Sequence, residues 1–217
     1  MSNKALSPAE LELTQKIQLH FPRNIDNEIL GAWNGCSKET LTAKLAEMFK
    51  QKPVVSLLDP IGTLIIAPTT KPFVAYDHFA VNTGSKAKVK IAYLDGGFQN
   101  GFISKIEGPF GGSTLRFGKN KKSSVDYSLI NELGGEDGAE TTLTELWGAL
   151  LKQPHGKKGS LLTNGYANIF YIRSKNGVLR AVGAHWNDGG WNFCACPIEG
   201  PGEWSAGYLI FSRNSVS

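Results

Sequence analysis

The first quarter of the chain spaces its hydrophobic residues as amphipathic helices do. A cap at Ser7 predicts a helix that ends near His20, because a serine side chain satisfies free amide groups at a helix start. Ser37 predicts the cap of a second helix, which Pro53 stops. We therefore expect an N-terminal helical segment over residues 1–52.

Between residues 53 and 118 the hydrophobic positions change to short runs separated by prolines and glycines, a pattern typical of β-strands. The runs predict strands at 63–67, 73–81, 88–94, 101–106 and 114–117. The run that begins at Lys88 alternates polar and apolar residues, which indicates a strand with one solvated face. The sequence therefore predicts a β-rich subdomain that forms a small curled sheet or barrel.

The remainder of the chain, residues 119–217, predicts two helices and then a C-terminal antiparallel sheet. One helix is expected over 125–133, and a capping box at Thr142 begins a second, which Pro154 ends. The expected fold class is α+β: N-terminal helices, the small curled β-sheet or barrel, then two helices packed on the C-terminal antiparallel sheet. The two subdomains can also form one compact unit.

Two glycine turns set the register expected for the C-terminal sheet. A two-residue loop at Asn176-Gly177 places Tyr171 opposite Val182, and Asp188-Gly189 predicts a second loop of the same kind. Alternation along the strands then predicts two largely apolar faces. One face carries Ile169, Tyr171, Val182, Ala184, Trp186, Trp191, Phe193 and Ala195, and the other carries Phe170, Ile172, Ala181, Gly183, His185, Asn192, Cys194 and Cys196.

Composition narrows the class of protein. With 217 residues, 41% hydrophobic and 19% charged, the chain is not disordered. The three cysteines form an odd and sparse set, which favours a reducing compartment over a disulfide framework. The sequence shows neither a signal-peptide pattern nor an apolar stretch that could span a membrane, so we expect a cytoplasmic protein without membrane contact.

A net charge of +4 is compatible with nucleic-acid binding but does not require it. The basic clusters at Lys86–Lys90 and Lys119–Lys122 are typical of solvated loops and of an edge strand. Together with aromatic residues they also permit a site for single-stranded nucleic acid, which we keep as an alternative function.

Several segments resemble a family of short, uncharacterised bacterial proteins of about this length. They are 161–166, 168–171, 177–182, 211–215, 123–126 and 132–136. The likeness covers most of the chain. Since that family has no established activity, the resemblance implies a size and a compartment but no catalytic residue.

His185, Cys194 and Cys196 share a predicted sheet face and could supply three ligands to a zinc ion. A fourth ligand has only unplaced candidates, Cys36 and His20. The rest of that face is apolar, where free cysteines are common as core residues. We therefore expect core thiols and no metal or cofactor, and we keep a hydrolase or metal-dependent enzyme centred on these three residues as an alternative.

None of the four histidines lies in a nucleophile motif. His78, beside Asp77 in the strand expected at 73–81, is the candidate for an acid–base role. The glycine-rich stretches 108–112 and 134–138 lack the lysine and the strand–helix context of a phosphate loop, so they are expected to be turns.

Tryptophans gather near the C-terminus, where aromatic rings lie beside amide side chains. The register of the second hairpin places Trp186 opposite Trp191. Such rings serve core packing, a protein-contact surface, or stacking on a base or sugar. We expect a non-catalytic binding or interaction protein, with a protein partner or self-association. The candidate contact residues are Trp186, Asn187, Asp188, Trp191 and Trp204.

Overall fold

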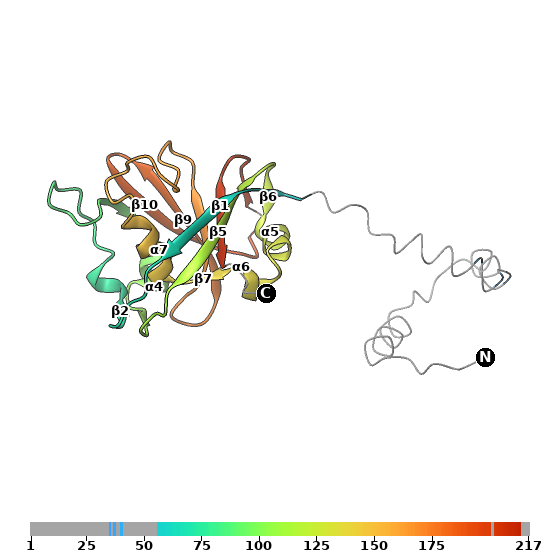
Figure 1. Cartoon of the computed structure of the whole chain (residues 1–217), viewed down its shortest axis with the longest axis horizontal. Coiled ribbons are helices and arrows are strands. Elements are labelled where there is room, and N and C mark those ends of the chain that lie inside the picture. Colours follow the sequence, from blue (N-terminus) through green and yellow to red (C-terminus); the bar gives the residue numbers. More distant parts are fainter. Residues whose placement is uncertain (1–34, 36, 38–39, 41–55, 201, 214–217) are drawn as a thin grey trace. The chain divides into compact units, whose positions relative to one another are not determined.

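The structure is a computed structural model that describes residues 35, 37, 40, 56–200 and 202–213 (Figure 1). Residue contacts divide the chain into two units, Met1–Val54 and Val55–Ser217. In the first unit, the Thr40 backbone N–H donates to Ser37 Oγ at 3.2 Å, which is the geometry of a helix cap. The helix expected to end near His20, the rest of the helix after Ser37, and Cys36 lie outside the described residues.

The second unit is built around one mixed, eight-stranded sheet in the order β1-β5-β12-β8-β9-β10-β3, with β7 also paired to β8. The strands are β1 (Leu58–Ile66), β3 (Ile91–Leu94), β5 (Ser113–Asn120), β7 (Glu140–Thr141), β8 (Asn168–Arg173), β9 (Leu179–Asn187), β10 (Gly190–Pro197) and β12 (Leu209–Arg213). Three pairs are parallel: β3 with β10, β12 with β8, and β7 with β8. Only the β8–β9 and β9–β10 pairs are hairpins, and every other pair in the sheet joins strands that are separated by other elements of the chain.

The expected fold class is wrong in how it groups these strands. β1 and β5, from the segment expected to form its own curled sheet or barrel, pair with each other, and β5 also pairs with β12. β3 from the same segment pairs with β10. Periodicity shows which positions of a strand are buried, but it carries no information on which strand supplies the partner.

The two helices expected before the C-terminal sheet are present as α5 (Asp126–Glu132) and α7 (Leu143–Leu150). The capping box at Thr142 is confirmed, because its side chain and that of Glu145 exchange hydrogen bonds with each other's backbone amides. The expectation that both helices pack on a C-terminal sheet is wrong. Leu146 of α7 belongs to the larger apolar core and Leu129 of α5 to the smaller one.

Two further helices complete the set among the described residues: α4 (Gly96–Phe102) and α6 (Glu136–Ala139). α4 occupies part of the segment expected to be a strand at 101–106, so that prediction is wrong. Asp95 accepts a hydrogen bond from the Phe98 N–H at 2.6 Å and caps the helix. Phe98 and Phe102 lie four residues apart and are fully buried, which is the helical periodicity that the strand assignment missed.

Two short strand pairs of the second unit lie outside its main sheet. β2 (Phe73–Val74) pairs with β4 (Ile106–Glu107), and β6 (Ser124–Val125) pairs with β11 (Glu203–Trp204). A single 3-10 turn, η1 (Ala75–Asp77), follows β2 in the segment expected to be a long strand. In the part of the chain that the structure describes, no helix is long and apolar enough to cross a membrane.

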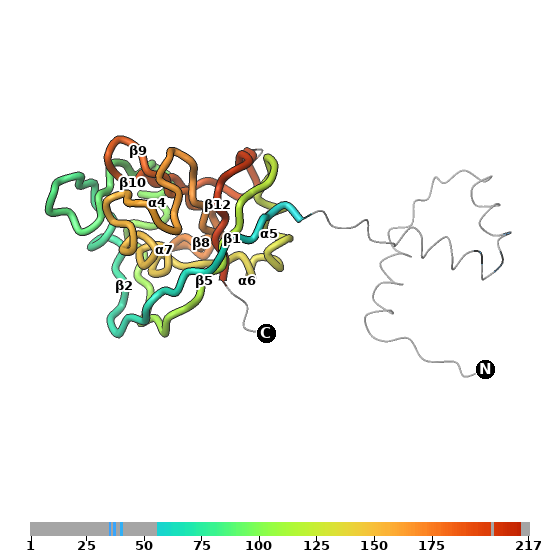
Figure 2. The backbone as a smooth tube through the Cα atoms, turned by 45° about the horizontal axis from the view of Figure 1, so that its top comes forward, coloured from blue at the N-terminus to red at the C-terminus, as the bar shows by residue number. Residues whose placement is uncertain are grey.

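The sheet separates two apolar cores of different size. The larger one is rich in aromatic rings and includes Phe79, Phe98, Phe170, Trp191, Phe193 and Phe211. The smaller one, under α5, includes Leu129, Ile169, Tyr171 and Ile210. Figure 2 shows α4 and α7 near each other and α5 and α6 together toward the other end of the sheet. Each core packs against one face of the sheet, so the apolar layers on the two faces differ in size.

The β9–β10 turn has the two-residue loop that the sequence predicts. Asp188 and Gly189 adopt φ values of 53° and 77°, as this turn type requires. Trp186 lies opposite Trp191, which confirms the predicted register.

The β8–β9 loop differs from the prediction by one residue. The Ser174 N–H donates to the Val178 carbonyl at 2.8 Å, so the three residues between them form the loop. Within it Gly177 has a φ of 78°, whereas Asn176 is not among the residues with positive φ. Tyr171 therefore pairs with Ala181 rather than Val182.

This shift moves every β8 side chain to the opposite face. Phe170 and Ile172 pack with Val182 in the larger core, while Ile169 and Tyr171 pack in the smaller one. The predicted grouping of these four β8 residues with β9 and β10 is therefore wrong.

Candidate functional site

The aromatic hairpin places its two tryptophans in different surroundings. Trp191 is fully buried, and its Nε1–H donates to the Gln153 carbonyl at 3.2 Å. Trp186 is half-buried and meets Trp191 edge-on, with ring centroids 5.5 Å apart. Asn187 and Asp188 are exposed in the turn. Trp186 and the turn are thus the parts of this candidate surface that solvent reaches, while Trp191 is a core residue.

Trp204 does not join Trp186 and Trp191 but packs against the smaller core. Its Nε1–H donates to Asp126 Oδ1 at 2.6 Å, and the Tyr171 hydroxyl donates to the same oxygen at 2.8 Å. Burial raises the pKa of Asp126 although both hydrogen bonds act in the opposite direction. The indole N–H of Trp204 is therefore already satisfied inside the protein.

His185, Cys194 and Cys196 do not form the zinc site that we kept as an alternative. Among the described residues there is no group of three His, Cys, Asp or Glu side chains placed to hold a metal ion. Burial raises the pKa of Cys194 to about 12 and also raises the pKa of Cys196, which disfavours the thiolate form that metals bind. Burial lowers the pKa of His185, which lies opposite Asn192 in the sheet.

The two basic clusters lie at different places in the fold. Lys119 is near the end of β5, opposite Asp59, whereas the loop with Lys88 precedes β3 and shares a cavity with Ile66. Ile66 pairs with Ser113 at the other end of the β1–β5 ladder, roughly 20 Å from Lys119 at the usual strand rise. The clusters therefore do not form one continuous basic groove.

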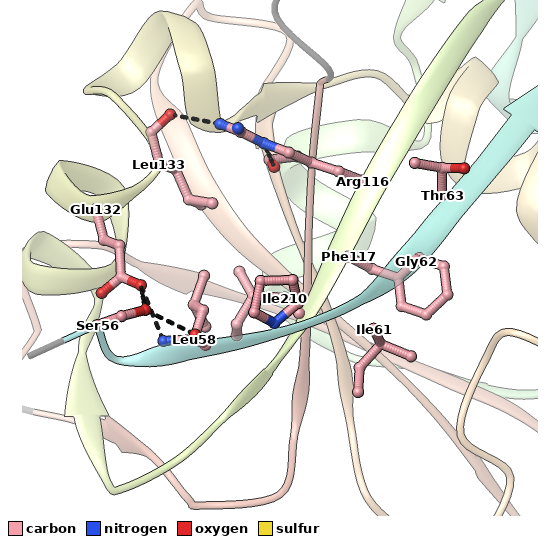
Figure 3. Close-up of a pocket in the computed structure, with 13 residues that line it drawn as sticks. Ser56, Leu58, Ile61, Gly62, Thr63, Arg116, Phe117, Glu132, Leu133 and Ile210 are labelled. Carbon is pink, nitrogen blue, oxygen red and sulfur yellow. Dashed lines mark hydrogen bonds between the residues drawn. The ribbon is translucent and has the colours of Figure 1, made fainter.

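A cavity that sequence reasoning missed opens on the face of β1, β5 and β12 beside α5 (Figure 3). Its volume is about 430 Å³, within the range of small-molecule sites. Most of the lining is apolar: Leu58, Pro60, Ile61, Phe117, Leu133 and Ile210. We call it the Arg116 cavity, because Arg116 is the cation among the described residues that line it.

Arg116 is held in place by two neutral acceptors. Its Nε–H donates to Ser212 Oγ at 3.0 Å, and an Nη2 hydrogen donates to the Leu133 carbonyl at 3.1 Å. The ion pairs among the described residues use Lys105, Arg173 and Arg213 and leave Arg116 out. The Nη1 group likewise makes no hydrogen bond within the described part of the chain. One edge of a fixed guanidinium thus remains available to a ligand.

Glu132 lines the same cavity but is engaged elsewhere. Its carboxylate accepts hydrogen bonds from the Ser56 hydroxyl and from the backbone N–H groups of Leu57 and Leu58, at 2.6 to 2.9 Å. Burial alone would raise the pKa of Glu132, but these hydrogen bonds outweigh it and hold the pKa below its usual range. Glu132 therefore anchors the start of β1 to α5 and does not neutralise Arg116.

The strand pattern contains a weak signal for this site. Leu115 and Phe117 point into the larger core, so alternation turns Arg116 toward the other face. A lone arginine at such a position is also typical of a solvated strand, and Ser212 and Leu133 lie 96 and 17 residues away in sequence. Only the fold brings these partners together.

Comparisons with known proteins do not indicate a function for this chain, so a proposal has to rest on the geometry of the site. A scan against protein-family models, a search of curated proteins and a search of solved structures each found no match. The resemblance to short bacterial proteins stays a prediction.

Proposed function

We propose that the chain is a non-catalytic binding protein whose Arg116 cavity holds a small, mainly apolar molecule that carries one carboxylate. The observation that supports this most directly is the Arg116 guanidinium, partly buried in an apolar cavity and hydrogen-bonded only to neutral acceptors. A cation withdrawn from water is stabilised best by an opposite charge.

The free edge of Arg116 suits a carboxylate. Arginine presents parallel N–H donors that match two carboxylate oxygens, and such charge-assisted hydrogen bonds are about twice as strong as neutral ones. The Ser212 hydroxyl is fully buried and accepts from Arg116, so it holds the guanidinium in the orientation that leaves its other edge to the ligand. Pro60 and Ile61, which are exposed at the cavity, provide an apolar surface for the remainder of the molecule.

Binding without turnover follows from the groups that line the cavity. Within the described residues the lining contains no histidine and no cysteine, and its acid, Glu132, is fully engaged in hydrogen bonds. A serine nucleophile requires a base within hydrogen-bond reach, and the partner of Ser212 is a guanidinium, which stays protonated. These residues can position a ligand but do not provide acid–base catalysis.

The test is calorimetric titration with benzoate, phenylacetate and hexanoate, each compared with its uncharged primary amide. We expect at least one acid to bind and its amide to bind at least tenfold more weakly, a difference of about 1.4 kcal/mol. Arg116→Gln should abolish this preference for the acid. Equal binding of acids and amides, or no binding of any acid, would contradict the proposal.

A pair of isoleucines in β1 supplies a matched control, since Arg116→Gln also removes a bond to the end of α5. Ile61 and Ile65 are exposed by 52% and 69%, and only Ile61 lines the cavity. Ile61→Glu places a negative charge at the cavity and should weaken acid binding at least fivefold, whereas Ile65→Glu should leave it unchanged. Equal effects of the two variants would place the ligand elsewhere.

A protein contact at the aromatic hairpin is a second proposal. It is supported by the half-buried ring of Trp186 beside the exposed Asn187 and Asp188. Trp186→Ala should weaken self-association or partner binding more than it lowers stability, because an exposed indole edge contributes mainly to contacts. Acrylamide should quench the emission of a variant that keeps only Trp186. Complete protection of that ring in the monomer would remove this proposal.

A further inference from the structure

A second cavity lies beside the larger core and has a different chemistry. Its volume is about 550 Å³, and it is enclosed by the segment after β1, by the turn after β2 and by α7. Its apolar lining includes Ile66, Phe73, Trp147 and Leu151, together with Pro68 and Pro72. We call it the His78 cavity.

The rim of the His78 cavity is cationic. Lys71, Lys88 and Lys152 come from three separate connecting segments, before β2, before β3 and after α7, and line the same space. In the part of the chain that the structure describes, no ion pair involves any of the three, and no aspartate or glutamate lines the cavity. Three like charges around one cavity repel each other, so an anion placed between them is stabilised by all three.

His78 lines the same cavity, and aromatic neighbours hold its ring. Its ring stacks on Phe73, with centroids 4.4 Å apart, and lies 4.9 Å from the centroid of Trp147. Burial lowers the pKa of His78, the nearby charge of Lys88 lowers it further, and Asp77 acts in the opposite direction. The ring is therefore neutral at neutral pH, and a neutral imidazole can donate one hydrogen bond to an anion.

We propose that the His78 cavity binds a phosphate ester: the phosphate lies among Lys71, Lys88 and Lys152 with His78 beside it, and the apolar part of the ester covers Leu151 and the two prolines. A phosphate monoester carries between one and two negative charges at neutral pH and three acceptor oxygens. Three ammonium groups on flexible stems match a phosphate better than they match a carboxylate, because a carboxylate carries only one charge. This site is independent of the Arg116 cavity.

The test is titration with phenyl phosphate at low ionic strength, followed by calorimetry and by the NMR signals of the histidine rings. We expect the His78 ring signals to shift while those of His185 stay unchanged. Lys88→Gln and Lys152→Gln should each weaken binding about fivefold, and the double variant more than tenfold, because each removes one close positive charge. Raised salt should weaken binding as well.

Lys175→Gln is the matched control, since Lys175 is also exposed but lies in the β8–β9 loop and does not line the cavity. It should leave binding of phenyl phosphate unchanged, as should Arg116→Gln. Absence of binding, an equal loss in Lys175→Gln, or unshifted His78 signals would each overturn the proposal. A single-stranded oligonucleotide that binds much more tightly and loses affinity equally with every lysine variant would do so too, because it would indicate a general basic surface.

Discussion

The Arg116 and His78 cavities lie on the two sides of one sheet and present positive charge in different ways. Arg116 is held by Ser212 and Leu133, so its free edge has a fixed direction. The lysines around the His78 cavity extend from three connecting segments, and none of them forms an ion pair with a described residue. The first arrangement selects a ligand by geometry and the second by the amount of charge.

The apolar cores next to the two cavities also differ in the interactions that hold them together. Under the His78 cavity, aromatic rings pack on one another, and the centroids of Phe79, Phe98 and Phe193 lie 5.0 to 5.3 Å apart. On the other side, the smaller core encloses the carboxyl group of Asp126 with its two hydrogen-bond donors. We therefore expect aromatic packing to dominate the stability of the larger core. In the smaller core, the hydrogen bonds to Asp126 should contribute strongly.

The largest effect should come from the aromatic side. Trp191→Ala should lower the free energy of unfolding by about 3–5 kcal/mol, because the ring is fully buried and its removal leaves a cavity. Urea denaturation measures the loss. Trp186→Ala at the neighbouring position should cost clearly less, since that ring is half-buried. Equal losses would mean that both rings belong to the same closed core.

On the polar side, Asp126→Ala should cost about 2–3 kcal/mol, because it leaves the hydroxyl of Tyr171 and the indole N–H of Trp204 without an acceptor. Asp126→Asn keeps an acceptor oxygen and should lose less. The same urea experiment compares the two variants. If the alanine variant were as stable as the asparagine variant, the hydrogen bonds to Asp126 would contribute little.

The raised pKa of Asp126 also predicts a dependence on pH. The folded protein holds this proton at pH values where the unfolded chain, with a pKa near 3.8, has lost it. The part of the stability that is linked to this proton is therefore fully present below pH 3.8 and is lost as pH rises through the folded pKa. The difference in unfolding free energy between the wild type and Asp126→Asn should decline as pH rises above that value. A difference that grows with pH would mean that the folded pKa is lowered.

The smallest loss of stability is expected in the β8–β9 loop, whose length sets which β8 side chains face each core. Gly177→Val should cost about 1–3 kcal/mol, because a β-branched residue is strained at the φ of 78° found there. Asn176→Ala should change stability little, since Asn176 is not at positive φ. Denaturant midpoints distinguish the two. A cost at Asn176 as large as that at Gly177 would indicate the two-residue loop after all.

Local features of the second unit could be predicted from the sequence because short-range interactions determine them. The capping box at Thr142 depends on residues three positions apart, and the turn at Asp188-Gly189 on two adjacent residues. The pairing of Trp186 with Trp191 follows directly from that turn. Each of these elements forms from groups that are close in sequence whatever the rest of the chain does.

The tertiary structure alone decided the partners. The β8–β9 register depends on whether the loop has two or three residues, and a shift of one residue exchanges the buried faces. The parallel pairing of β12 with β8 and of β3 with β10 joins strands that are far apart in sequence. The Arg116 cavity requires β5, β12 and α5 to meet. Hydrophobic burial is non-directional, so the sequence shows which side chains leave water but not which distant neighbours they meet.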